Sequence, residues 1–450
     1  MEKNMKKTLK SSIAVTLIFA FLLSACKETP REQIRSSTIP SSKISDEISE
    51  QNISDISESV SSENPIRLVT HDVEFSDRTT GNENGYYYLE KGDGVSANLR
   101  YIDYASGQDI FLSSRPEGNH FTPEDESYVS SIAGFGEAFP IGNALYLVRS
   151  GAPSYKDLLG QDAMAAIFRM DLNGSQRTQI YTGMANEVLQ STMASDGKSL
   201  FWVSQRTEME NDSPIQKRYL VQMDIQTGET KDLSELTNSS WLIGAADGVL
   251  IFHSIYAETG TAAGIPEMTH EIFAYSFETE ALSVLQTWPQ QETASTHVFN
   301  NSLVTASLLS RTVMVRELSS EQNLVTYQFP DSVSEDLSGF WFETCRDGRY
   351  AFWDYSAEQL HVLNLSTGEW NSVTLTYDDP DKLELRPVEI YAENTTQFLV
   401  CYDKEIVERH YSNLEGTIST LQRTQPCFAL IDKEDYWNSI PNYQVIVFNE

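Results

Sequence analysis

Two hairpin-like segments near the middle of the chain decide the fold. The first is Ser195-Asp196-Gly197-Lys198-Ser199-Leu200-Phe201-Trp202-Val203, and the second is Tyr219-Leu220-Val221-Gln222-Met223-Asp224-Ile225-Gln226-Thr227-Gly228-Glu229. Each joins an apolar run to a Gly-containing tight turn. Asp-Gly favours two-residue hairpin turns, because both central residues need positive φ. Residues 193–233 therefore predict one unit of four short strands, with tight turns after the first and third strands and a longer loop after the second.

This unit recurs at intervals of about fifty residues, the period of a four-stranded propeller blade. The copies of its first turn are Asn84-Gly85, Gly142-Asn143, Asp196-Gly197, Asp247-Gly248, Asn300-Asn301, Asp347-Gly348 and Asn394-Thr395. Runs such as Val249-Leu250-Ile251-Phe252 are apolar at consecutive positions, which is typical of a sheet covered on both faces. The sequence predicts an all-β β-propeller of seven blades, and six or eight blades also fit the spacing.

A second turn recurs in the same units. Its copies include Ser106-Gly107, Asn173-Gly174, Thr227-Gly228, Glu278-Thr279-Glu280, Ser319-Ser320-Glu321 and Thr367-Gly368, and the copy near Asp432 to Asn438 is degenerate. Asp and Asn before these turns form local side-chain hydrogen bonds with the backbone. The Asp-x-x-Thr-Gly-Glu pattern is therefore interpreted as turn chemistry rather than as a recognition motif.

The two ends of the folded region are also predicted. Tyr443 to Phe448 is expected to form a strand that completes the last blade, and Ile66 to Val69 is expected to pair beside it and help close the ring.

Composition limits the classes of function. The chain has 450 residues, of which 40% are hydrophobic, and a net charge of -33. So negative a surface repels nucleic acid, and we expect no nucleic-acid partner. A broad contact with anionic lipid headgroups is disfavoured for the same reason.

The N-terminus carries a targeting segment. Four lysines up to Lys10 precede the apolar run Ile13 to Leu23, which is too short for a permanent membrane span. The run ends in Leu23-Ser24-Ala25-Cys26, which resembles the lipobox of bacterial lipoproteins. This resemblance implies cleavage before Cys26 and acylation of its thiol. We therefore expect an extracytoplasmic protein whose membrane partner is reached through lipid on Cys26.

The domain organisation follows from these segments. Residues 1–25 are the predicted signal peptide, residues 26–65 the lipid-bearing Cys26 and a flexible Ser- and Glu-rich linker, and residues 66–450 the propeller. A linker of this length has a root-mean-square reach of roughly 35 Å. The propeller pattern resembles TolB-like propellers, and most closely the uncharacterised propeller lipoproteins of Gram-positive bacteria. The shared motifs are structural and imply no active site.

Loop lengths predict which side of the propeller has a function. Within a blade of strands A to D, the A–B and C–D turns share one side, named here the short-loop face. The B–C connections and the D–A links between blades share the opposite side, the long-loop face. All the long segments are of the second type: 149–165, 206–217, 256–270, 404–426, 114–130, 288–295 and 377–387. Long insertions gathered on one side usually mark a binding surface.

The candidate binding residues on the long-loop face are aromatic, histidine or acidic. They are His120, Phe121, Tyr128, Tyr155, Tyr256, His270, Trp288, Tyr377, Asp378, Asp379, His410 and Tyr411. Exposed aromatic anchors suit recognition of a protein, peptide or glycan. Packing of each aromatic within its own loop is the alternative, and so is solvation of the acids, including Glu124, Asp125 and Glu126.

The sequence contains no strong catalytic or cofactor-binding motif. The sequence contains no H-E-x-x-H, G-x-S-x-G or phosphate-binding glycine loop. We therefore assign no catalytic residue, no metal ligand and no cofactor. Cys345, Cys401 and Cys427 are odd in number, which argues against a disulfide framework, although a Cys401–Cys427 bridge stays open.

Two functional hypotheses follow. The first is a membrane-tethered binding or scaffold propeller that engages a protein, peptide or glycan through the long-loop face. The second is an extracellular hydrolase or lyase with carboxylates or histidines from several blades at the mouth of the central channel. A sensor domain is a third, weaker hypothesis.

Overall fold

The computed structural model describes residues 65–449, except for 74–75, 80, 92–95, 116–119, 121, 123, 131–134, 157–161, 238, 247, 258–267, 290–293, 319–323, 334–339 and 413–417. The predicted signal peptide, Cys26 and all of the linker before Pro65 lie outside these residues. Contacts divide the chain into Met1–Ser59 and Val60–Glu450, and the description concerns the second unit. Within its described part, no helix is long and apolar enough to cross a membrane.

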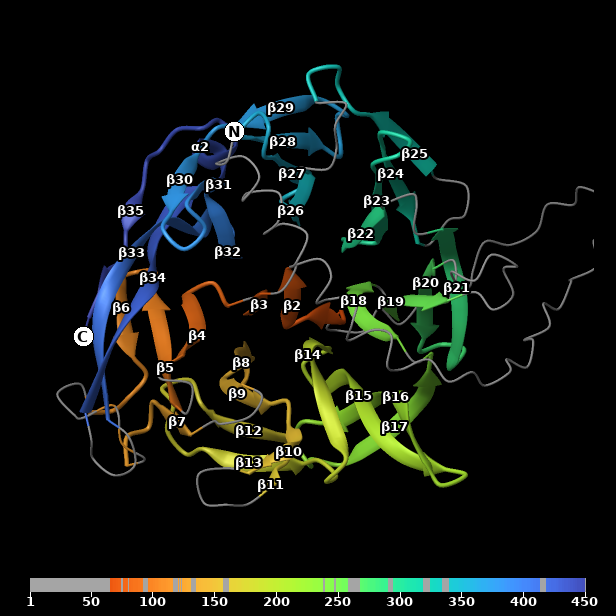
Figure 1. Ribbon diagram of the computed structural model, residues 1–450, viewed down its shortest axis with the longest axis vertical. Coiled ribbons are helices and arrows are strands. Elements are labelled where there is room, and N and C mark those ends of the chain that lie inside the picture. The colour runs from red at the N-terminus through yellow and green to blue at the C-terminus, as the bar shows by residue number, and fades with distance from the viewer. Residues whose placement is uncertain are drawn as a thin grey trace, which may run out of the picture. The chain divides into compact units, whose positions relative to one another are not determined.

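Seven antiparallel blades form the ring of Figure 1, which confirms the predicted fold. In chain order, blade 1 contains β4 (Gly85–Lys91), β5 (Ser96–Asp103) and β6 (Gln108–Phe111); blade 2 contains β8 (Phe135–Ile141), β9 (Ala144–Arg149), β12 (Ala166–Asp171) and β13 (Thr178–Thr182); blade 3 contains β14 (Glu187–Ser195), β15 (Ser199–Glu210), β16 (Ser213–Asp224) and β17 (Thr230–Leu236). Blade 4 contains β18 (Ser240–Ala246), β19 (Val249–Ala257), β20 (Met268–Ser276) and β21 (Ala281–Pro289); blade 5 contains β22 (Ala294–Phe299), β23 (Ser302–Ser307), β24 (Thr312–Glu317) and β25 (Leu324–Gln328). Blade 6 contains β26 (Phe340–Arg346), β27 (Arg349–Asp354), β28 (Gln359–Asn364) and β29 (Trp370–Val373); blade 7 contains β32 (Glu389–Glu393), β33 (Gln397–Ser412), β34 (Ile418–Asp432) and β35 (Gln444–Val445).

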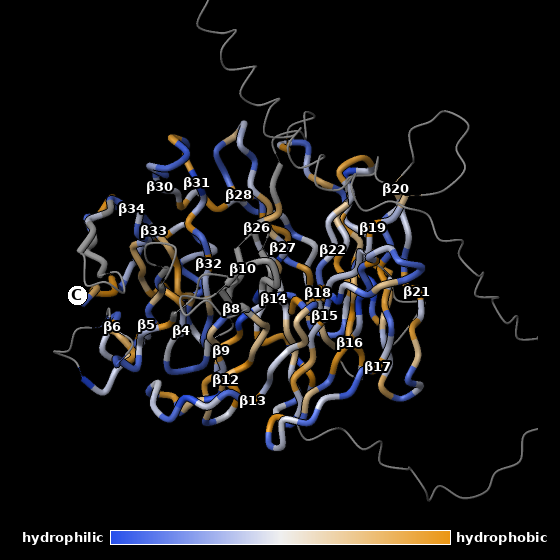
Figure 2. The backbone as a smooth tube through the Cα atoms, turned by 60° about the horizontal axis from the view of Figure 1, so that its bottom comes forward, coloured by the Kyte–Doolittle hydropathy of each residue, from blue (hydrophilic) through white to orange (hydrophobic). Residues whose placement is uncertain are grey.

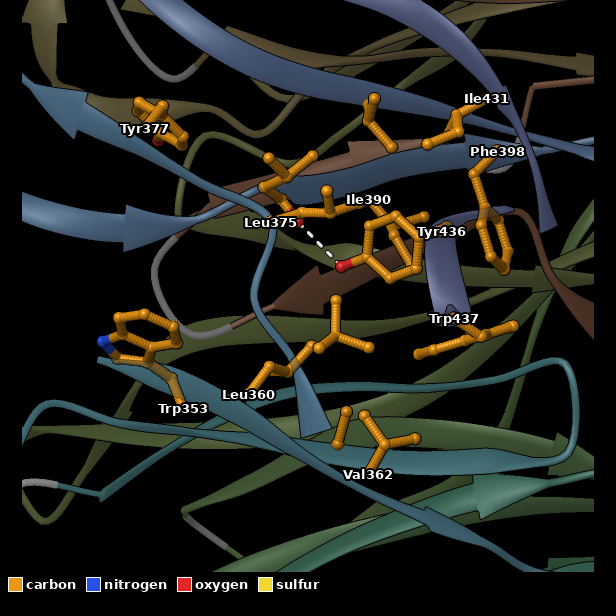
Figure 3. Packing of buried hydrophobic residues seen from close by; sticks show 14 of the residues in the cluster. Trp353, Leu360, Val362, Leu375, Tyr377, Ile390, Phe398, Ile431, Tyr436 and Trp437 are labelled. Atoms are coloured by element: carbon orange, nitrogen blue, oxygen red, sulfur yellow. Dashed lines mark hydrogen bonds between the residues drawn. The ribbon is translucent and has the colours of Figure 1, made fainter. Parts of the chain in front are cut away.

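Apolar residues from neighbouring blades form a core at each junction. Trp353 and Leu360 of blade 6 pack with Phe398 and Val400 of blade 7, as Figure 3 shows for part of this cluster. Equivalent clusters join the other pairs, including blade 7 to blade 1 through Leu399. In Figure 2 the hydrophobic segments accordingly lie along the strands, while many of the connections are hydrophilic. Each sheet is covered on both faces, which explains the consecutive apolar residues.

The recurring Gly-containing turns have the predicted role. The carboxylate of Asp224 accepts hydrogen bonds from the backbone N–H groups of Gln226 (2.9 Å) and Thr227 (2.8 Å). Gly228 has a φ of 75°, where a side chain would be strained. In blade 6, Asn364 and Gly368 (φ 76°) repeat this arrangement. These residues therefore specify turns on the short-loop face.

The degenerate seventh turn is a short helix, α2 (Lys433–Trp437). It lies on the short-loop face, because the Trp437 indole N–H donates to Asp347 Oδ2, 2.9 Å away, in the first turn of blade 6. The Tyr436 hydroxyl donates to the carbonyl of Val388 at 2.8 Å, the bond that is drawn in Figure 3. The helix thus fastens the end of blade 7 to blade 6.

The C-terminal segment closes the ring. β35 completes blade 7, and then β36 (Val447–Phe448) pairs in parallel with β6 as the outermost strand of blade 1. The expected strand at 443–448 is therefore divided between two blades. Another part of blade 1 is also split: β7 (Tyr128–Ser130) continues the outer strand by pairing with β5.

The N-terminal expectation was wrong. β1 (Arg67–Leu68) pairs with the inner edge of β14 in blade 3, not with the C-terminal strand. The segment before Asn84 also does not form the inner strand of blade 1. It forms a separate hairpin of β2 (Thr70–Val73) and β3 (Ser76–Thr79), which lies in the centre of the ring in Figure 1. The segment around β1 thus pairs with the inner edge of β14 instead of closing the ring beside the C-terminal strand.

Candidate interaction face

Strand direction assigns every connection to one of the two faces. β14 runs from the long-loop face to the turn at Asp196-Gly197 on the short-loop face, and β15 returns. Most of the expected long loops prove to be hairpins. β15 and β16 stay paired up to Glu210 and Ser213, and β33 and β34 stay paired up to Ser412 and Ile418. The segments predicted there as long loops are therefore extensions of the blade strands.

Two smaller hairpins occur among the same connections. β10 (Ala152–Lys156) pairs with β11 (Asp162–Ala163) between strands of blade 2. β30 (Thr376–Asp379) pairs with β31 (Glu384–Pro387) in the link from blade 6 to blade 7. Among the described residues, paired backbone therefore forms much of the long-loop face and positions the side chains there.

The β30–β31 hairpin is fastened to blade 7 by charge. Asp379 Oδ2 lies 2.8 Å from Lys404 Nζ, and both side chains are largely buried. Burial acts to raise the pKa of Asp379, but the hydrogen bond and charge of Lys404 and the backbone N–H groups of Asp381 and Lys382 together outweigh it, and the pKa lies below its usual value. Burial acts to lower the pKa of Lys404, and Asp379 raises it above its usual value. A second hydrogen bond joins the hairpin to blade 7, from the Thr424 hydroxyl to Asp381 Oδ1.

Tyr377 lies beneath this ion pair. Its hydroxyl donates to Glu389 Oε1 at 3.1 Å, and its ring lies 5.6 Å from Lys404 Nζ. Burial and then the Glu389 carboxylate raise the pKa of Tyr377, so its hydroxyl stays protonated. With 5% of Tyr377 and 1% of Asp379 exposed, both residues support the hairpin rather than face solvent.

A histidine pair lies in blade 4. His253 Nε2 is 2.9 Å from His270 Nδ1, so one imidazole donates a hydrogen bond to the other. Trp288 stacks on His270, and Trp241 lies against His253. Burial, followed by repulsion from His270, lowers the pKa of His253 to about 3. The pair is therefore neutral near pH 7, with an indole ring against each imidazole.

The link from blade 1 to blade 2 is organised around Asp125. Its carboxylate accepts from the Ser127 hydroxyl at 2.6 Å and the Ser113 hydroxyl at 2.9 Å, and it lies 3.1 Å from His120 Nδ1. Burial acts to raise the pKa of Asp125, but the hydrogen bonds from Ser127 outweigh it and the pKa is lowered. Neighbouring Glu126 accepts from the backbone N–H of Ser114 at 2.7 Å. These acids hold the link in shape.

The candidate residues therefore fall into three groups. His120, Tyr128, Trp288, Tyr377 and Asp379 are buried. For the aromatic residues this is the packing alternative that the sequence left open, whereas Asp379 and His120 were expected on the surface. Tyr256 and His270 are partly exposed, and Asp378 is exposed. Phe121 and the side chains of Tyr155, His410 and Tyr411 lie outside the description.

Sequence reasoning missed the apolar tips of the long-loop face. The exposed fractions are 90% for Leu383, 70% for Leu309, 69% for Met209, 62% for Ile406 and 47% for Met184. Each lies in a B–C connection or a D–A link. Met209, Leu383 and Ile406 fall within segments that were predicted as long loops, but attention to aromatic anchors passed over them, and Leu309 and Met184 lie in short connections outside those segments. These five side chains share the long-loop face, and other exposed apolar residues, such as Val284, Leu324 and Val447, lie on outer strands.

Near these exposed apolar residues, several cations are held in ion pairs, whereas several acids are exposed to solvent. The cations Arg206, Lys404 and Arg423 each pair with a carboxylate of the protein itself. Glu210, Asp212, Asp378 and Glu405 are exposed beside the tips, and Lys382 is an exposed cation there. Among the described residues beside these side chains, the exposed charge is therefore predominantly negative.

Neither a metal centre nor a disulfide is present among the described residues. No group of three or more His, Cys, Asp or Glu is arranged there to hold a metal ion. Cys401 and Cys427 are free thiols, and so is Cys345. Burial raises the pKa of Cys345 to about 12 and that of Cys427 to about 11, so neither thiol is activated as a nucleophile.

Comparison with known proteins identifies no relative by sequence: no family model and no curated protein matches. Similar solved structures include an oligogalacturonate lyase from Vibrio parahaemolyticus, with 12% identity, a TM-score of 0.46, and coverage of 82% of this chain and 92% of that one. A puromycin hydrolase has 10% identity, a TM-score of 0.42, and coverage of 81% and 54%. TolB from Acinetobacter baumannii has 10% identity, a TM-score of 0.30, and coverage of 79% and 77%. At these scores the comparisons carry no functional argument, and the propeller assignment rests on strand topology.

Proposed function

We propose that this protein is an extracytoplasmic, lipid-tethered propeller that binds a partner protein through its long-loop face. The observation that carries the proposal is the set of exposed tips Met209, Leu309, Leu383 and Ile406, all on that face. Aliphatic and thioether side chains contribute to binding mainly by leaving water. They suit an apolar protein surface better than a glycan.

The exposed acids beside the tips define the partner further. Glu210, Asp212, Asp378 and Glu405 would complement a basic rim around an apolar centre. The proposed partner therefore presents apolar side chains surrounded by lysine or arginine. Exposed charges contribute mainly to the association rate, so we expect this rate to fall with added salt.

Two matched variants test the face. The face variant is Met209→Ser, Leu309→Ser, Leu383→Ser and Ile406→Ser. The control variant is Leu282→Ser, Val284→Ser, Leu324→Ser and Val325→Ser, which changes exposed residues on the outer strands β21 and β25. In crosslinked membranes, the wild type and the control variant should capture the same partner and the face variant should lose it.

Equal capture by both variants, with unchanged thermal unfolding, would refute the face assignment. The alternative function, an extracellular hydrolase or lyase, has its own readout. Release of reducing ends or of free amino groups from cell-wall material by the purified protein would support it.

The proposal of a lipid tether is based on the sequence Leu23-Ser24-Ala25-Cys26 and is tested separately. Cys26→Ser should abolish incorporation of labelled fatty acid and release the protein from the membrane fraction. Retention of the label by this variant would contradict acylation at Cys26. An origin in a Gram-positive bacterium, which the sequence resemblance implies, remains part of the proposal.

A further inference from the structure

The direction of β1 shows on which face the chain enters the propeller. β1 is antiparallel to β14, with Arg67 opposite Ser195 and Leu68 opposite Ala194. Ser195 directly precedes the turn at Asp196-Gly197, which belongs to the short-loop face. Pro65 and Ile66 therefore lie toward the short-loop face, and the chain runs from there into the ring.

This entry is fixed by buried hydrogen bonds. The backbone N–H of Val69 donates to the carbonyl of Met193 at 2.9 Å. The Thr70 hydroxyl donates to the carbonyl of Ser191 at 2.6 Å and accepts from the backbone N–H of Met193 at 2.8 Å. The pairing of β14 with β15 shifts its register between Leu189 and Met193, and Thr70 binds within this irregularity.

Packing reinforces the same placement. Val69 is 2% exposed and belongs to the core cluster between blades 2 and 3. Ile66 and Leu68 pack against the cluster between blades 3 and 4. The segment thus lies in the interior of the propeller, and reversing its direction would break both sets of contacts.

We infer that the membrane tether joins the propeller on its short-loop face, so that the long-loop face points away from the bilayer. This inference rests on the proposed tether and deepens the proposed function. It assigns the partner to the space beyond the propeller: a soluble or wall-borne protein with an apolar, basic-rimmed surface, rather than a protein embedded in the same membrane. The expected linker, with a root-mean-square reach of roughly 35 Å, would attach at the short-loop face and so keep this face the nearer of the two to the bilayer on average.

The test places one fluorophore on each face of the same blade. Gln226→Cys lies in the C–D turn of blade 3, and Ser213→Cys lies at the tip of its β15–β16 hairpin; both positions are exposed. The chain used is residues 27–450 preceded by a six-histidine tag, bound to vesicles that contain nickel-chelating lipid and an acceptor-labelled lipid. The raised pKa values of Cys345 and Cys427 and the burial of Cys401 leave the added thiol as the reactive one.

Energy transfer to the membrane should be higher from position 226 than from position 213. Deleting residues 30–57 should widen this difference, because a shorter linker restricts tumbling. Equal transfer from the two positions, or higher transfer from position 213, would overturn the orientation. Because the tag replaces acylation, this outcome is independent of the proposed tether, which is judged by Cys26→Ser alone.

Discussion

Both ends of the propeller add a strand to a blade, but they do so in opposite ways. β1 pairs antiparallel with the inner edge of blade 3, and β36 pairs parallel with the outer edge of blade 1. β1 leads into the buried Val69 and Thr70, whereas Val447 in β36 is 57% exposed. Burial and backbone hydrogen bonds can hold an inner strand in place. An exposed outer strand needs further stabilising contacts from side chains.

For β36 the side chain of Arg100 makes these contacts. Its Nε lies 3.0 Å from Asp109 Oδ1, and its Nη2 donates to the carbonyl of Asn449 at 2.9 Å. Its guanidinium also lies 3.9 Å from the centre of the Phe448 ring. One fully buried cation therefore joins the C-terminus to blade 1, and the comparison predicts that the two strand additions fail under different perturbations.

The largest effect is expected from Arg100→Leu. It leaves the buried carboxylate of Asp109 without its cation, which should lower the free energy of unfolding by about 3–5 kcal/mol. Urea denaturation would measure this loss. The exposed Lys231→Leu serves as the control and should change stability by less than about 0.5 kcal/mol. A loss at Arg100 no larger than that of the control would show that the C-terminal closure does not depend on this cation.

A smaller loss is expected from Thr70→Val on the inner strand. The substitution keeps the shape of the side chain but leaves the N–H of Met193 and the carbonyl of Ser191 without their partner. The expected cost is about 1–3 kcal/mol, and Thr70→Ser should retain most of the stability. If Thr70→Ser were as unstable as Thr70→Val, the hydroxyl would not be the group that fixes β1.

The stability of the fold around β36 should also depend on pH. Burial raises the pKa of Asp109 to about 6, although Arg100 opposes this shift. The folded protein then binds this proton more tightly than the unfolded chain, so the contribution of Asp109 to stability is lost as pH rises from about 4 to about 6. The wild type should lose stability relative to Asp109→Asn by at most about 1.4 kcal/mol per pH unit over this interval. Parallel stability profiles for the two proteins would contradict the assigned pKa.

The smallest effect is expected at the exposed rim. Val447→Thr places a hydroxyl in solvent and should change stability by less than about 0.5 kcal/mol. The same substitution at Val69 buries a hydroxyl in the core and should cost about 1–3 kcal/mol. Thermal unfolding of the two variants compares the inner and outer positions directly, and equal losses would remove the distinction between them.

Much of the fold could be predicted because its signals are local. Gly228 and Gly368 mark turns through their own backbone conformation, and runs such as Val249 to Phe252 mark strands covered on both faces. The candidate site was less predictable. Trp288 and Tyr377 are aromatic residues in predicted links, but whether each faces solvent depends on neighbours such as His270 and Lys404 from other strands. The pairing of His253 with His270 was not predicted, because the two lie 17 residues apart in the chain and only the register of β19 against β20 brings them together.

The sequence by itself determined the repeat, the turn chemistry and the division into a short-loop and a long-loop face, because these properties depend on residues close together in the chain. Only the tertiary structure decided where the two ends are bound. β1 and β36 are short segments that pair with edges about 130 and 340 residues away, and strand pairing alone offers many such edges of similar backbone chemistry. Thr70 in the irregularity of β14 and Arg100 beneath Phe448 select one edge for each.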